Sequence, residues 1–135
     1  MKKMINLTEE MKEIIKKQLA ILATVDEFGN PNIGPKRSMR LYDEKSFMFN
    51  ENTGGSTQKN IKNNGKMAIA YIDRENLKGY RFVGTAKLYT DGKYFEDAVK
   101  WAEKNNMKVP KAAGVFTIEK IFTLHSGAQA GKEVK

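Results

Sequence analysis

The chain has 135 residues, 40% of them hydrophobic, and this length suits one domain with a single modest core. It contains no cysteine and one histidine, which excludes disulfides, thiol catalysis, thiolate zinc sites and a multi-histidine metal site within one chain. Lysine and arginine number 24 against 16 aspartates and glutamates, and the resulting net charge of +8 would attract a polyanion or a phosphate-bearing ligand.

The first half of the chain predicts one helix and three strands. Residues 8–17 predict an amphipathic helix, because a threonine cap and two acidic residues precede apolar residues at helical spacing. Residues 19–25 are apolar and predict the first strand. Residues 32–42 predict the second strand, in which Pro35 indicates an edge, a bulge or an opening of the sheet. A turn then leads into a third strand at residues 46–49.

The second half predicts a short helical stretch through Asn60 and Ile61 and a longer amphipathic helix with Asp91 as its candidate cap. Three further strands are predicted at residues 67–72, 80–88 and 113–124, and the last residues, 131–135, are expected to be mobile. The total is about six strands and two to three helices, without regular alternation of strand and helix. This order favours a mainly β fold, an antiparallel barrel or sandwich, built as a single domain over residues 1–135.

Three cations, Lys36, Arg37 and Arg40, fall within five residues of the second predicted strand. Because side chains alternate along a strand, Lys36, Ser38 and Arg40 would share one face and Arg37 would lie on the other. Neighbouring cations repel one another, and an anionic ligand would relieve this repulsion. The alternative is an edge strand whose charges face solvent and prevent aggregation, and these residues alone favour that alternative.

A glycine-rich loop follows the third strand. Residues 54–59 read Gly-Gly-Ser-Thr-Gln-Lys, so that Ser56 and Thr57 open a helical segment. Hydroxyl groups at a helix N-terminus suit a phosphate, whereas the alternative is an ordinary Ser/Thr cap, which is favoured in isolation. The order of the segments strengthens the phosphate interpretation, because a basic strand, a short strand and this helix start follow one another in the chain.

Catalytic side chains are scarce in this sequence. His125 and Ser126 are sequence neighbours, which is a poor geometry for a nucleophile and its base, and we expect His125 to be structural. We therefore predict no catalytic residue and no metal site.

Several segments, taken in order, carry a resemblance to a known family. They are residues 23–26, 29–31, 41–45, 47–52, 56–64, 67–71 and 84–86. Together they resemble the pyridoxamine 5′-phosphate oxidase-like, FMN-binding split-barrel family, from about residue 19 to residue 88, with a weaker match in the helix and strand beyond.

The resemblance implies a six-stranded antiparallel Greek-key split barrel that forms a homodimer and holds FMN at the subunit interface. The positions that would bind FMN are Lys36, Arg37, Ser38, Arg40, Asn50, Glu51, Ser56 and Thr57. Flavin would carry the redox chemistry of an oxidoreductase or electron carrier, with a small molecule as electron donor or acceptor. The oxidases have a basic pair where this chain has Ser56 and Thr57, which removes two phosphate charges. They also have a longer C-terminal part that completes the vitamin substrate site, so oxidation of pyridoxamine phosphate itself is not expected here.

Two alternatives remain open at this point. One is a non-enzymatic small barrel that binds nucleic acid through its positive charge, although the cations are scattered and we expect no specific nucleic-acid binding. The other is a related split barrel that binds a deazaflavin or haem. The first six residues do not predict a secretory signal, and no apolar run approaches the ~18 residues of a membrane span. We therefore expect a cytoplasmic protein without membrane association.

Overall fold

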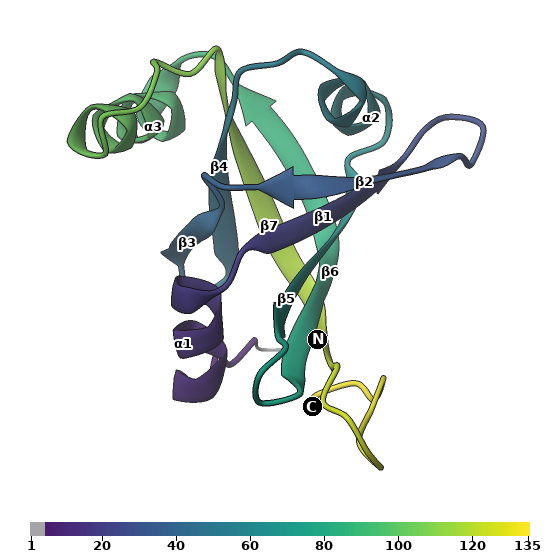
Figure 1. The fold of residues 1–135 in the computed structure, drawn as a ribbon. Helices are drawn as coiled ribbons and strands as arrows, with labels where there is room; N and C mark the ends of the chain where they lie inside the picture. The colour runs from purple at the N-terminus through teal and green to yellow at the C-terminus, as the bar shows by residue number, and fades with distance from the viewer. Residues whose placement is uncertain (1–4) are drawn as a thin grey trace.

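One antiparallel sheet organises residues 5–135, the part of the chain that the computed structural model describes (Figure 1). Its strands are β1 (Ala20–Val25), β2 (Pro31–Lys36), β3 (Arg40–Asp43), β4 (Ser46–Glu51), β5 (Lys66–Asp73), β6 (Lys78–Tyr89) and β7 (Ala112–Thr123). Their spatial order is β2-β1-β5-β6-β7-β4-β3, so the two edge strands are consecutive in sequence. The sheet therefore curls until its edges meet at the β2–β3 turn. The predicted antiparallel split barrel is confirmed.

The prediction of one strand at residues 32–42 is wrong, because the structure has two strands there. β2 ends at Lys36, the chain turns with the Met39 N–H donating to the Lys36 carbonyl at 3.2 Å, and β3 begins at Arg40. The sheet of the described residues thus has seven strands in place of six. The alternation predicted for residues 36–40 also fails, because Ser38 and Met39 are both buried while Arg37 is exposed. The edge position indicated by Pro35 is confirmed.

Three helices within residues 5–135 cover the barrel: α1 (Glu9–Lys17), α2 (Ser56–Asn63) and α3 (Gly92–Lys104). Helix α1 forms as its sequence predicts, with the Thr8 hydroxyl accepting the Met11 N–H at 3.2 Å and its apolar face buried. Figure 1 shows α1 at the end of the barrel with the β5–β6 turn, and α2 and α3 at the opposite end. The helices therefore distinguish the two ends of the barrel.

Aromatic side chains fill the barrel. Phe47, Phe82 and Phe116 are fully buried, and the Phe47 and Phe82 rings meet edge to face with centroids 5.1 Å apart. The last residues, expected to be mobile, are instead bonded to β7: Glu133 pairs with Phe122, and the Val134 N–H donates to the Ile121 carbonyl at 2.8 Å. The C-terminal segment thus returns along β7. In residues 5–135, no helix combines the length and the apolar character needed to span a membrane.

Candidate functional site

The predicted site residues lie around one end of the barrel, where the β2–β3 turn meets the end of β4. The Ser38 hydroxyl accepts the Asn50 N–H at 2.9 Å and donates to the Asn50 carbonyl at 3.4 Å. Both residues are buried. These two hydrogen bonds fasten the turn to β4, so Ser38 holds the site together from inside.

A buried ion pair joins β2 to the end of β4. Lys36 Nζ lies 3.3 Å from Glu51 Oε2, and the two side chains are only 17% and 1% exposed. The other oxygen, Glu51 Oε1, accepts the Thr53 N–H at 3.1 Å, the Thr53 hydroxyl at 3.0 Å and the Gly54 N–H at 3.4 Å. Burial raises the pKa of Glu51, but the Lys36 charge and the Thr53 hydrogen bonds outweigh it, so this pKa lies below its ordinary value. One ionised carboxylate therefore positions both Lys36 and the loop that leads into α2.

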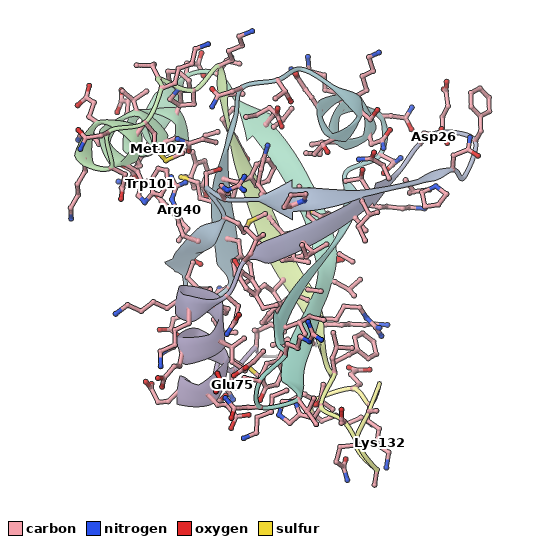
Figure 2. The ribbon with its side chains drawn as sticks, in the orientation of Figure 1. Asp26, Arg40, Glu75, Trp101, Met107 and Lys132 are labelled. Carbon is pink, nitrogen blue, oxygen red and sulfur yellow. The ribbon has the colours of Figure 1, made fainter. Side chains whose placement is uncertain are left out.

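Arg40 is held beneath α3. Its Nη1 donates to the Ser38 carbonyl at 2.7 Å and to Asn50 Oδ1 at 3.1 Å, and its guanidinium lies 3.9 Å from the centre of the Trp101 ring (Figure 2). Burial lowers the pKa of Arg40 to about 10, which leaves it charged at neutral pH. The Arg40 Nη2 atom is buried without a hydrogen-bond partner in residues 5–135, and so is Asn52 Oδ1. A donor and an acceptor are thus left unsatisfied near the site.

The start of α2 lies beside β2 and is not capped by a side chain. Gly55, not Ser56 or Thr57, is the N-cap residue, and it has no side chain with which to cap the helix. Thr57 instead accepts a hydrogen bond from Asn32 of β2, with Nδ2 and Oγ1 3.3 Å apart, while Ser56 is exposed. The ordinary-cap alternative is therefore wrong, and the first-turn N–H groups remain available to an anion.

Arg37 differs from the other two cations of the segment. It lies in the β2–β3 turn with its side chain exposed, and it forms no hydrogen bond or ion pair within residues 5–135. Lys36 is engaged by Glu51 and Arg40 by Ser38 and Asn50. Arg37 is therefore the cation of this segment whose charge is free to meet a ligand.

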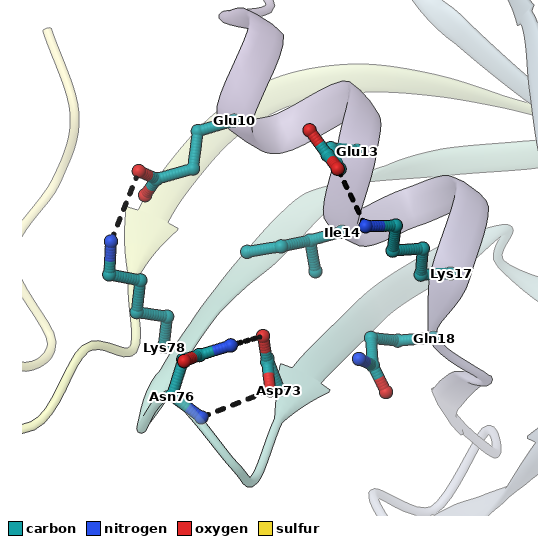
Figure 3. Close-up of a pocket in the computed structure, with 8 residues that line it drawn as sticks. All are labelled: Glu10, Glu13, Ile14, Lys17, Gln18, Asp73, Asn76 and Lys78. Carbon is teal, nitrogen blue, oxygen red and sulfur yellow. Dashed lines mark hydrogen bonds and ion pairs between the residues drawn. The ribbon is translucent and has the colours of Figure 1, made fainter.

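A hollow of about 400 Å³ lies at the opposite end of the barrel, between α1 and the β5–β6 turn (Figure 3). Four of its five charged residues are already paired, Lys17 with Glu13 at 2.7 Å and Lys78 with Glu10 at 3.3 Å. The fifth, Asp73, accepts hydrogen bonds from the backbone and side-chain N–H groups of Asn76 at 3.1 and 2.8 Å. Beside it, His125 Nε2 lies 2.9 Å from Glu10, which fits the structural role expected of this histidine. None of the predicted site residues lines this hollow, and its paired charges make it a weaker candidate than the β2–α2 end.

Sequence reasoning missed two contributors, Trp101 and Asn32. Trp101 would be expected simply to pack a helix face, and only the tertiary fold brings it onto Arg40. Asn32 is the second residue of the edge strand β2, and its link to Thr57 spans 25 positions of the chain. No local pattern signals either contact.

A family model described as pyridoxamine 5′-phosphate oxidase matches residues 7–125. The chain belongs to the pyridoxamine 5′-phosphate oxidase-like family. The crystal structure of HupZ from Group A Streptococcus is 60% identical to it, with 93% of this chain and 99% of that chain covered and a TM-score of 0.86. MJ0282 of Methanocaldococcus jannaschii, an uncharacterized protein, is 35% identical over 132 residues, which cover 95% of this chain and 87% of that protein.

The pyridoxamine 5′-phosphate oxidase-like fold is shared with more distant proteins. An FMN-binding protein from Syntrophomonas wolfei subsp. wolfei is 21% identical, with 89% of this chain and 92% of that chain covered and a TM-score of 0.70. The family suggested by the segments of this sequence is thus confirmed. The part played by the eight site residues in binding FMN stays a prediction.

Proposed function

We propose that the protein is a flavoprotein that binds FMN at the subunit interface of a homodimer and acts as an oxidoreductase or flavin electron carrier. The observation that carries this proposal is the contact of Lys36 and the loop before α2 with one carboxylate, Glu51. This contact brings an uncapped helix N-terminus next to the basic end of β2, which is an arrangement that favours a phosphate group. Membership of the pyridoxamine 5′-phosphate oxidase-like family and the shared fold with the FMN-binding protein from S. wolfei support the choice of FMN.

The residues of this end fit the groups of FMN. Arg37 and the first turn of α2, with the hydroxyl groups of Ser56 and Thr57, would hold the phosphate. The unsatisfied Arg40 Nη2 and Asn52 Oδ1 provide a buried donor and acceptor, which a polar ligand would satisfy. We propose that Ser38, Asn50 and Glu51 act mainly by positioning these groups, because their own polar atoms are already hydrogen-bonded to the protein.

FMN, when bound, supplies the transfer of electrons, and a small molecule would serve as electron donor or acceptor. The chain's part is to bind and orient the cofactor and to adjust the charge around it. Lys36 and Arg37 place positive charge at this end of the barrel, and Glu51 offsets the charge of Lys36. The side chains around the flavin site therefore favour negative charge on the bound group, because the described residues offer no acidic partner to Arg37 or Arg40.

FMN is expected to bind more tightly than riboflavin. The two flavins differ by the phosphate, and the proposed site directs Arg37 and the α2 N-terminus toward that group. A charged hydrogen bond contributes about 1.5–3 kcal/mol, so we expect a preference of roughly ten- to a hundredfold. Fluorescence titration of the purified protein with each flavin measures it, and equal affinities would contradict the phosphate assignment.

A homodimer is expected in solution. The side chain of Ile33, in the middle of the edge strand β2, is 73% exposed in the single protomer, and Pro31 and Pro35 on either side of it are also exposed. An obligate dimer would bury roughly 2,000 Å² or more. Light scattering at low micromolar concentration with FMN present tests this, and the mass of a single 15.3 kDa chain would count against it.

A further inference from the structure

The β1–β2 hairpin presents an aromatic side chain on a fixed, acidic tip. Asp26 Oδ1 accepts the N–H groups of Phe28 and Asn30, each at 2.8 Å, and Oδ2 accepts the Asn30 side-chain amide at 3.0 Å. These hydrogen bonds define the turn and hold the Phe28 side chain 81% exposed next to the exposed Glu27. Nothing in the protomer's own core uses Phe28. A preformed knob of this kind suits insertion into a partner.

A surface of complementary chemistry lies on the segment between α3 and β7, residues 104–111, which we call the α3–β7 segment. Lys104, Lys108 and Lys111 are exposed on it, and no acidic residue lies between them. The apolar side chains of Met107 and Val109 are exposed among these lysines. This surface is basic and apolar, whereas the hairpin tip is acidic and aromatic, so the two surfaces match in charge and in apolar character.

The two surfaces lie near opposite ends of β2. Asp26 and Met107 are on opposite sides of the molecule in Figure 2. Strand β2 has six residues and spans roughly 20 Å from the hairpin tip to Lys36. At the Lys36 end, the Lys111 N–H donates to the Glu51 carbonyl at 3.0 Å, which ties the α3–β7 segment to the candidate site. The tip and the segment therefore do not meet within one chain.

A two-fold axis through the middle of β2 would exchange the ends of this strand between two copies. The axis would pass near Ile33, the most exposed apolar side chain of β2. Each tip would then reach the α3–β7 segment of the other copy. Pro31 and Pro35 remove two N–H donors from β2, so the two copies would pack through side chains and not as a continuous sheet.

We propose that two copies of this chain pack along β2 with each hairpin tip docked on the α3–β7 segment of the other, so that the partner's Phe28 borders each candidate flavin site. This inference rests on the proposed function for the dimer and for the ligand. It adds the contact between the hairpin tip of one copy and the α3–β7 segment of the other, which brings Phe28 to the site. The charges of Asp26 and Glu27 would face those of Lys104, Lys108 and Lys111 across the interface. Phe28 would pack on Met107 and Val109.

Thiol cross-linking tests this contact directly, because the chain has no native cysteine. In the double variant Phe28→Cys/Met107→Cys, a short bifunctional thiol reagent should link most of the protein into covalent dimers. The matched control, Leu77→Cys/Met107→Cys, moves the first cysteine to an exposed position on the β5–β6 turn and should stay largely unlinked. Phe28, Leu77 and Met107 are all exposed, so the far-UV circular dichroism of each variant should match that of the parent chain. Equal cross-linking in the two variants, or none in the first, overturns the contact.

Charge reversal provides a second readout. Glu27→Lys and Lys108→Glu should each weaken dimerisation by about fivefold, the combined effect of losing two symmetry-related exposed ion pairs, and the double reversal should restore it. Additive losses in the double variant would overturn the pairing. Failure of the proposed FMN-binding homodimer would give other results. A parent protein that is monomeric would overturn both the dimer and the contact between the tip and the α3–β7 segment. Cross-linked dimers that bind no flavin support the contact and contradict the FMN proposal.

Discussion

Arg37→Glu is expected to abolish FMN binding and to leave the stability of the protein without FMN unchanged. Arg37 is exposed in the β2–β3 turn and forms no hydrogen bond or ion pair within residues 5–135, so the folded chain loses no contact. Loss of a charged hydrogen bond alone would weaken FMN binding by roughly ten- to a hundredfold. The new carboxylate adds repulsion of the phosphate. FMN titration and a melting curve without FMN measure the two effects.

Arg74→Glu is the matched control for this variant. Arg74 is also an exposed arginine, but it lies on the β5–β6 turn at the opposite end of the barrel. The net charge changes equally in both variants, so any general attraction between the basic protein and the phosphate changes similarly. Arg74→Glu should therefore keep near-native FMN affinity. Unchanged affinity in Arg37→Glu would return Arg37 to the role of a solvated cation at the edge of the sheet.

Local sequence patterns predicted helix α1 and strands β5 and β6, whose structure depends on residues close to one another in the chain. Helix α1 forms where its threonine cap, acidic first turn and apolar face place it, because each of these signals acts within four residues. The strands at residues 67–72 and 80–88 lie within β5 and β6, which pair with each other through a short turn. The resemblance to the family also predicted that the site residues lie together. That resemblance is carried by the ordered segments and not by any single motif.

The break in the second strand was not predictable from its own residues. Residues 36–40 contain no glycine, proline or asparagine, so they carry none of the strongest turn signals. The turn is fixed by contacts from elsewhere in the chain: the N–H of Asn50 reaches Ser38, and Trp101 stacks on Arg40. The C-terminal segment was misjudged for a similar reason. Its polar composition is typical of a mobile tail, but its backbone finds hydrogen bonds on β7 that composition does not encode.

Gly114 connects the core packing to the candidate site. It lies on β7 directly opposite Phe49 of β4 and leaves room for the Phe49 ring, which is fully buried. Lys36 Nζ lies 5.5 Å from the centre of the same ring. A Cβ atom on residue 114 would overlap ring atoms of Phe49. The Lys36–Glu51 ion pair therefore lies beside the ring that a side chain at residue 114 would displace.

Gly114→Ala is expected to destabilise the protein strongly. Overpacking a filled core costs about 1–3 kcal/mol, and this methyl group meets a rigid ring, so we expect a loss near 3 kcal/mol and a fall in melting temperature of about 10 °C. Gly34→Ala is the control. Gly34 alternates with Ile33 along β2 and so lies on the face opposite the one that carries Ile33, and a Cβ atom there meets nothing within 4 Å, so the stability of the protein without FMN should change little. In the double variant Gly114→Ala/Phe49→Leu, the smaller, flexible side chain relieves the overlap. The double variant should therefore be more stable than the two single losses predict by addition. Strictly additive losses would show that the Phe49 ring is not what excludes a side chain at residue 114.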